Sequence, residues 1–166
     1  KSTLLRIING VIRADNGTVE IDGSAVLDNE ELKQKMVFVP DDLFFFPGYT
    51  LKDTANFYKA LYHSFDMTYF NELANMLKLD VKTKINSLSK GLKRQSALIC
   101  ALATKAKYMF FDETFDGLDP VMRQAVKSIF AKEIEERGMT PIIASHNLRE
   151  LEDICDHVGL LHRGGV

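Results

Sequence analysis

The sequence is short of cysteine, of long apolar runs and of excess charge of one sign, and each shortage excludes a class of protein. Only two of its 166 residues are cysteines, Cys100 and Cys155. They stand apart without CxxC or Cys/His spacing, so the sequence predicts no zinc site, no structural disulfide and a reduced, cytoplasmic protein. No run approaches the roughly eighteen apolar residues that a membrane-spanning helix requires.

The charge balance also limits the partners of the chain. Lysine and arginine total 21 against 23 acidic residues, which gives a formal net charge of −2. Because both signs are interspersed, we predict no broad basic field and no strong non-specific attraction to nucleic acid or an anionic membrane, and nucleic acid is not an expected partner. With 46% hydrophobic and 27% charged residues, the composition is typical of one compact domain.

Predicted strands alternate with helices at both ends of the chain. Up to residue 40 we expect a helix after Lys1, an antiparallel hairpin over 16–23, a short helix over 29–36 and a strand over 37–40. Helices follow within 51–65, 68–79 and 87–105. The remaining residues are expected to form a strand over 108–112, a helix from Pro120 toward Gly138, a strand over 140–146, a helix over 147–156 and a strand over 157–162. This order predicts an α/β fold with a mostly parallel sheet and an inserted helical region.

The stretch "YMFFDETFDGLDP" at 108–120 combines a buried strand with carboxylates. Continuous apolar runs are typical of strands that are covered on both faces. Asp112 and Glu113 then lie at the carboxyl end of the strand, where open α/β sheets bind ligands. The alternative is a strand that runs into a polar turn without further function.

The first residues have the form of the end of a phosphate-binding loop, GxxxxGK[ST]. In that interpretation Lys1 contacts the terminal phosphates, and the Ser2 hydroxyl is an oxygen ligand for Mg²⁺. Asp112 suits a magnesium partner through water, and Glu113 is placed to orient or deprotonate a water. His146, after the predicted strand over 140–146, could donate a hydrogen bond to a phosphoryl group; the alternative is a solvent-exposed histidine at a helix start.

Four segments in this order, "KSTLL", "LSKGLKRQ", "YMFFDETFDGLDP" and "IIASH", resemble the nucleotide-binding domain of ATP-binding cassette (ABC) transporters. The resemblance covers essentially the whole chain and implies the P-loop NTPase fold. It implies a Walker A end at Lys1, Ser2 and Thr3, a Walker B aspartate at Asp112, a catalytic glutamate at Glu113 and a switch histidine at His146. It also implies signature residues at Ser89 and Gly91, which bind the nucleotide of the opposite subunit, and a D-loop residue at Asp119.

The same resemblance implies the cofactors, the partners and the location. It implies an ATPase that uses ATP and Mg²⁺, a homodimer or heterodimer of cassettes, transmembrane permease subunits, and a peripheral position on the cytoplasmic face of the cell membrane. We expect a single domain over 1–166, with a core lobe of 1–47 and 105–166 and a helical subdomain of 48–104. Because the chain begins without Met and inside Walker A, we expect preceding residues in the complete protein, and we expect ATP binding and hydrolysis of that protein rather than of these residues alone.

Several positions depart from the family pattern. Lys90 and Leu92 replace a glycine and the glutamine of the usual LSGGQ signature, Thr114 replaces a proline, and Asp41 stands at the glutamine of the Q-loop. At the Q-loop position, Asp41 still offers an oxygen to Mg²⁺, and the resemblance implies that it is the sensor between the nucleotide and the permease. Lys90 has two alternatives: its side chain attracts a phosphate, or it points to solvent. Asp41 and "KGLKRQ" resemble the bacterial branch associated with antibiotic and multidrug export.

Aromatic residues follow the Q-loop position, in "LFFFPGY" at 43–49. Phe44, Phe45 and Phe46 are consecutive, so in an extended segment they cannot all face the core, and we expect at least one to be exposed. The resemblance implies that this segment docks the membrane subunit; the alternative is a core between the two lobes. Two other functions remain open: a soluble ABC protein that acts on the ribosome or DNA, and a catalytically inactive regulatory cassette, against which Glu113 and His146 argue.

Overall fold

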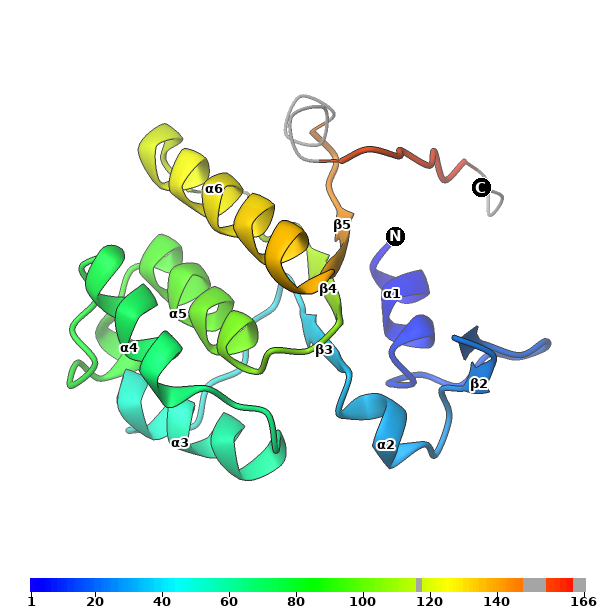
Figure 1. The fold of residues 1–166 in the computed structure, drawn as a ribbon, viewed down its shortest axis with the longest axis horizontal. Helices are drawn as coiled ribbons and strands as arrows, with labels where there is room; N and C mark the ends of the chain where they lie inside the picture. The colour runs from blue at the N-terminus through cyan, green and yellow to red at the C-terminus, as the bar shows by residue number, and fades with distance from the viewer. Residues whose placement is uncertain (116–117, 148–154, 163–166) are drawn as a thin grey trace.

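A three-stranded parallel sheet lies at the centre of the molecule (Figure 1). The computed structural model describes residues 1–115, 118–147 and 155–162. The sheet order is β3-β4-β5, with β3 at Met36–Val39, β4 at Tyr108–Asp112 and β5 at Thr140–Ala144. The predicted α/β class with a mostly parallel sheet and flanking helices is confirmed.

The register of the three strands aligns their carboxyl ends. Val39 of β3 pairs with Phe111 of β4, and Asp112 pairs with Ala144 of β5. The residues that follow the strands therefore emerge at one edge of the sheet, where parallel strands commonly place a ligand.

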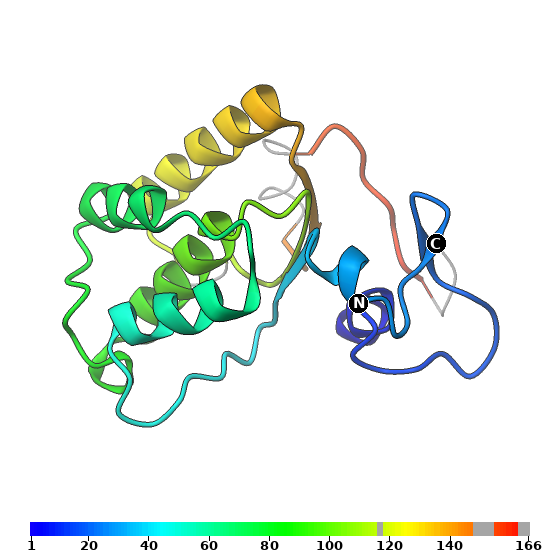
Figure 2. The ribbon, with the colours of Figure 1, turned by 60° about the horizontal axis from the view of Figure 1, so that its bottom comes forward.

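Alternate strand residues enter two separate apolar clusters, which explains why the strands read as continuous apolar runs. Val37, Met109 and Phe111 join the larger cluster, with the helices that lie between residues 51 and 137. Met36 and Phe110 join a smaller cluster on the other face, beside the two helices that precede β3. Figure 2 shows the same division, with the helical region on one side of the sheet and the chain start with the hairpin on the other.

The N-terminal part consists of short elements. The first helix, α1, covers Ser2–Ile8, and α2 covers Glu30–Lys33 with the Asn29 side chain as its N-cap. Between them β1 (Glu20–Ile21) and β2 (Ser24–Ala25) pair in an antiparallel hairpin. Its two turn residues, Asp22 and Gly23, have φ angles of 51° and 72°, as a type I′ turn requires. The predicted antiparallel hairpin is present, but it lies over 20–25 rather than over 16–23.

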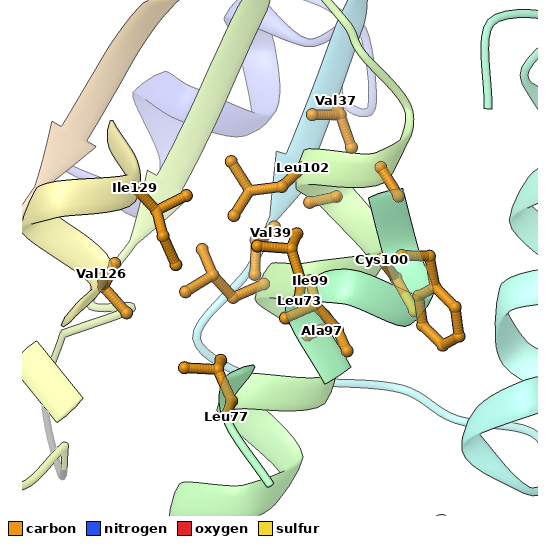
Figure 3. Packing of buried hydrophobic residues seen from close by; sticks show 14 of the residues in the cluster. Val37, Val39, Leu73, Leu77, Ala97, Ile99, Cys100, Leu102, Val126 and Ile129 are labelled. Atoms are coloured by element: carbon orange, nitrogen blue, oxygen red, sulfur yellow. The ribbon is translucent and has the colours of Figure 1, made fainter. Parts of the chain in front are cut away.

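The helical region contains α3 (Leu51–Leu61), α4 (Met67–Met76), the 3₁₀ turn η1 (Ile85–Ser87) and α5 (Lys90–Ala103). Side chains of Thr50, Asp66 and Ser89 cap the three α-helices, and Thr50 with Asp53 completes a capping box. Arg94 to Ala103 are all buried, because α5 lies between the other helices and the sheet. Figure 3 shows side chains of β3, α4, α5 and α6 meeting in this core.

The helix after the acidic strand is α6, at Pro120–Arg137. Asp119 caps its N-terminus, Pro120 occupies the first turn, and Gly138 ends it with a φ of 65°. Near its end the buried carboxylate of Glu133 is paired with Lys105 and Arg137. This charge cluster ties α6 to the segment that enters β4.

The C-terminal expectations have different outcomes. Most of the helix expected over 147–156 lies outside the described residues. The strand expected over 157–162 is wrong: the structure has no strand there, apart from an isolated bridge at His162. Its apolar residues Val158 and Leu160 are exposed, because no described strand forms a ladder with them. Within the described ranges, no helix is both long and apolar enough to cross a membrane.

Candidate functional site at the sheet edge

Three segments that are distant in sequence meet at the carboxyl edge of the sheet. The Lys1 ammonium group, at the start of α1, donates a hydrogen bond of 2.6 Å to the carbonyl oxygen of Ser145. The same nitrogen lies 3.6 Å from Oε1 of Glu113. Lys1 thus contacts the residues that follow β4 and β5, as the sequence predicted for residues that share one sheet edge.

Glu113 is the centre of this group. Its second carboxylate oxygen lies 2.8 Å from Nδ1 of His146 and 3.3 Å from the backbone nitrogen of His146, which donates to it. The Glu113 backbone has a φ of 50°, in the left-handed region that residues with a side chain rarely adopt. The Glu113 N–H donates to the Ala144 carbonyl at 2.8 Å, which holds this conformation. Such local strain clusters at functional sites.

Asp112, one residue earlier, is in a different environment. It is only 2% exposed, and its Oδ1 atom has no hydrogen-bond partner among the described residues. A buried carboxylate oxygen without a partner is costly unless a ligand or a water satisfies it. Asp112 therefore fits a cation ligand.

The residue types around Asp112 fit Mg²⁺ better than a metal held by the protein alone. The described residues contain no group of three or more His, Cys, Asp or Glu side chains that could hold a metal ion. Mg²⁺ is usually held by one or two protein oxygens together with phosphates and waters. Asp112 offers one such oxygen, and the exposed Ser2, in the first turn of α1 with Thr3, carries the hydroxyl that the sequence assigned to the metal.

The other predicted site residues lie at helix starts and make local contacts. The Ser89 hydroxyl accepts a hydrogen bond from the Leu92 N–H at 3.4 Å, and Gly91 follows within α5. Oδ1 of Asp119 accepts from the Met122 N–H at 2.9 Å. No hydrogen bond or ion pair between described residues joins Ser89, Gly91 or Asp119 to the group around Glu113.

Asp41 has a partner that the sequence did not reveal. Its carboxylate forms an ion pair with the guanidinium of Arg94. Arg94 is on α5 and only 3% exposed, whereas Asp41 is about half exposed. The pair links the segment after β3 to the helix that follows Ser89. An arginine at the start of the apolar half of α5 was the available signal, because a buried arginine requires a partner.

The departures from the family pattern differ in their surroundings. Leu92 packs against the larger apolar cluster. The residue at the glutamine position of the signature therefore contributes to the hydrophobic core. Lys90 is exposed, and no contact of its side chain with another described residue is seen. Thr114 is buried, and its hydroxyl has no hydrogen-bond partner among the described residues.

The aromatic segment after β3 borders a groove. A cavity of about 320 Å³ is lined by residues of β3, of this segment and of α3, among them Phe44, Phe46, Phe57, Tyr58 and Leu61. We call these five residues the aromatic groove. Phe44 is 74% exposed and Phe45 packs against the core, so the prediction of an exposed phenylalanine is confirmed.

Comparisons with known proteins point to one family. A family model described as "ABC transporter" matches residues 1–116. "ABC transporter ATP-binding protein YtrB" of Bacillus subtilis (strain 168) is 35% identical over 161 residues, which cover 97% of this chain and 55% of that protein. "Linearmycin resistance ATP-binding protein LnrL" of the same organism is 29% identical over 170 residues, covering 99% and 54%. "Bacitracin transport ATP-binding protein BcrA" of Bacillus licheniformis is 26% identical over 167 residues, covering 99% and 55%.

Solved structures share the fold. "Structure of ATP binding subunit of ABC transporter" superposes with a TM-score of 0.88 at 23% identity, over 99% of this chain and 70% of that one. A "putative Cobalt transport ATP-binding protein" superposes with a TM-score of 0.73 at 26% identity, over 92% and 56%. The chain spans about half the length of the curated relatives it matches.

Proposed function

Because the chain belongs to the ABC transporter family, we propose that it is part of an ATP-hydrolysing subunit that drives transport through partner membrane subunits. The observation that carries this proposal is the arrangement at the sheet edge, where Glu113 contacts both Lys1 and His146 beside the buried Asp112. A phosphate-binding cation, a water-activating carboxylate and a metal-binding carboxylate are the groups that ATP hydrolysis needs.

Each residue at the edge has a proposed role. Lys1 binds the β- and γ-phosphates, with Thr3 beside it in the phosphate-binding segment, and Ser2 and Asp112 hold Mg²⁺. The metal supplies charge stabilisation to the phosphates when it is bound. Glu113 accepts a proton from the attacking water, and His146 donates a hydrogen bond to the γ-phosphate. Since Lys1 and Glu113 contact each other here, phosphate binding draws Lys1 away and frees Glu113 for the water.

A second cassette would complete the site. Ser89, Gly91 and Asp119 are site residues by family resemblance, but no hydrogen bond or ion pair between described residues joins them to the Glu113 group. This separation supports a role toward the nucleotide held by a second copy or a related cassette, with Ser89 and Gly91 on the γ-phosphate and Asp119 at the interface. ATP-driven closure of such a dimer would be the step that moves the membrane subunits.

The aromatic groove supports a permease contact. An exposed phenylalanine beside a cavity is typical of a protein interface. The groove lies between β3 and α3, so it joins the proposed core lobe (1–47 and 105–166) to the proposed helical subdomain (48–104). We propose that the permease docks here, on the cytoplasmic side of the membrane, and that Asp41 senses the nucleotide next to this interface.

Export of a drug or an antibiotic is the proposed direction of transport. The names of LnrL and BcrA refer to linearmycin resistance and bacitracin transport. The "KGLKRQ" stretch and Asp41 are the features of this chain that support the same branch.

Phosphate release by the complete gene product tests the proposed chemistry. Glu113→Gln keeps the size and hydrogen-bonding capacity of the side chain but removes its basicity, so hydrolysis should fall by about 10²–10⁴-fold while ATP affinity is kept. Glu135→Gln, at an exposed glutamate of α6, is the matched control and should hydrolyse ATP as the wild type does. Loss of ATP binding together with turnover in Glu113→Gln would contradict the division of roles.

Light scattering of Glu113→Gln with and without Mg-ATP tests the second cassette. A change from monomer to dimer with ATP would support a shared site. A monomer that still binds ATP would contradict closure by the cassettes alone and would indicate that Lys90 disables the signature or that the membrane subunits are required.

A further inference from the structure

Two distant segments pair along the outer edge of the helical region. The Leu51 N–H donates to the Thr83 carbonyl at 3.2 Å, and the Lys52 N–H donates to the Val81 carbonyl at 2.9 Å. Thr50 and Lys84 form an antiparallel bridge. The start of α3 is therefore fixed beside the extended segment that precedes η1.

This pairing brings three lysines to one surface. In an extended segment alternate side chains point to opposite sides. Val81 packs against the core and Ile85 is buried, so Lys82 and Lys84 point outward, and both are exposed. Lys52, exposed in the first turn of α3, lies next to them through its bond to Val81. We call Lys52, Lys82 and Lys84 the lysine edge.

The ammonium groups of the lysine edge are available to a ligand. No ion pair joins them to another residue in the part of the chain that the structure describes. Two carboxylates, Asp53 and Asp80, lie in the same segments and partly offset the charges of Lys52 and Lys82, and each also accepts hydrogen bonds locally. Asp53 accepts from the backbone and hydroxyl of Thr50, and Asp80 accepts from the Lys82 N–H and the Thr83 hydroxyl.

The lysine edge is continuous with the aromatic segment. The Ile85 N–H donates to the Tyr49 carbonyl at 3.0 Å. The Tyr49 ring lies 5.1 Å from that of Phe46, which in turn lies 5.3 Å from that of the exposed Phe44. Because the permease is proposed to dock at the aromatic groove, this continuity places the lysine edge next to the permease, where lysines can contact the headgroups of the surrounding membrane.

We propose that the lysine edge binds the anionic headgroups of the membrane beside the permease. The inference rests on the proposed placement of the chain at a membrane. Exposed lysines on long, flexible side chains fit a plane of mobile anionic groups, because an ammonium group acts as a point charge without a fixed orientation. An exposed surface of this kind needs no single shaped partner. Each lysine near an anionic surface strengthens binding by about fivefold, and the attraction weakens as salt rises.

Co-sedimentation with vesicles tests the proposal on the complete gene product. We expect binding to mixed phosphatidylcholine and phosphatidylglycerol vesicles at low salt, weaker binding at about 150 mM salt, and none to pure phosphatidylcholine. Reversing two charges in Lys82→Glu/Lys84→Glu should weaken binding by at least about 25-fold. The double variant Lys33→Glu/Lys35→Glu makes the same change of charge at exposed lysines of the N-terminal part and should bind as the wild type does.

Three results would overturn the proposal: equal binding to neutral vesicles, unchanged binding of Lys82→Glu/Lys84→Glu, or an effect of that variant only when permease subunits are present. The last result would assign the lysine edge to an acidic segment of a protein partner. Phosphate release is measured on the same samples without vesicles. It should be unchanged in both double variants, so a failure of the lipid contact is distinguished from a failure of the ATPase proposal.

Discussion

Polar groups in the helical region mostly have hydrogen-bond partners within the chain, whereas several polar groups at the carboxyl edge of the sheet do not. In the helical region, Thr50, Asp66 and Ser89 cap helices, and the carboxylates of Asp53 and Asp80 have backbone partners. Two exceptions there are Gln95, whose buried Oε1 has no partner among the described residues, and Lys78, with a φ of 56°. At the sheet edge, buried oxygens of Asp112 and Thr114 have no partner among the described residues, and Glu113 adopts a left-handed backbone conformation.

The difference separates a scaffold from a binding site. Groups that are satisfied within the chain add stability whether or not a ligand is present. Groups that are buried without a partner cost stability until a ligand satisfies them, which is the usual cost of a prepared site. We therefore expect substitutions in the helical region, apart from those at Ser89 and Gly91, to change folding, and substitutions at the edge to change ligand binding.

The largest effect on stability is expected in the core of the helical region. Phe70 of α4 is fully buried, and Phe70→Ala should reduce the free energy of unfolding by about 3–5 kcal/mol through the cavity it creates. Urea unfolding measures this, with the exposed Phe44→Ala as the control that should change stability little. If the folded fraction of Phe70→Ala bound ATP more weakly, the separation of scaffold and site would be wrong.

A smaller, pH-dependent effect is expected at Glu133. Burial raises the pKa of this carboxylate, but hydrogen bonds from Tyr69 and Arg137 and the charges of Arg137 and Lys105 outweigh burial and hold the pKa below its ordinary value of 4.5. The ionised form thus stabilises the fold at neutral pH, and this contribution is lost as pH falls through the lowered pKa.

Glu133→Gln should therefore reduce the free energy of unfolding by about 1.5–3 kcal/mol at pH 7. The difference from wild type should shrink below pH 4.5. Unfolding curves at several pH values measure this, with exposed Glu135→Gln as the control. A pH-independent difference would show that the charge of Glu133 does not contribute.

Asp41 links the two regions, because it follows β3 and pairs with Arg94 of α5. Asp41→Asn weakens the pair with the buried Arg94 and should cost about 1–2 kcal/mol of stability without nucleotide. The exposed neighbour Asp42→Asn is the control. Unchanged stability with a loss of Mg-ATP affinity would instead place Asp41 with the sheet edge.

The smallest effect is expected at the capping box of α3. The Thr50 hydroxyl accepts from the Asp53 N–H at 3.1 Å, and Thr50→Ala should cost about 1 kcal/mol. Thermal unfolding measures the change, and the exposed Thr68→Ala within α4 is the control. Because alanine is the better helix former, Thr68→Ala should lose no stability; an equal loss in both variants would contradict the capping role of Thr50.

Much of the fold could be predicted from the sequence because its signals are local. Apolar runs marked β3, β4 and β5, and Pro120 and Gly138 marked the ends of α6. The hairpin was expected over 16–23 but lies over 20–25, with its turn at Asp22-Gly23. The strand expected over 157–162 failed because a strand also requires a neighbour, and an alternating pattern does not provide one.

The part of the candidate site that depends on converging strand ends could be predicted. The part that depends on which side chains pack together could not. Parallel strands carry Glu113 and His146 to the same edge, so their contact follows from topology. The Asp41–Arg94 pair and the lysine edge depend on packing between distant segments. The formal net charge of −2 did not reveal the lysine edge, because carboxylates balance the lysines over the whole chain.

The most direct measurement of the central claim is the unfolding of Asp112→Asn with and without Mg-ATP. Because Asp112 is a buried carboxylate with an unpartnered oxygen, the variant without nucleotide should be at least as stable as the wild type. Mg-ATP should stabilise the wild type and should no longer stabilise Asp112→Asn. A variant that is less stable without nucleotide but gains the full stabilisation from Mg-ATP would contradict the claim that this edge is built for the ligand.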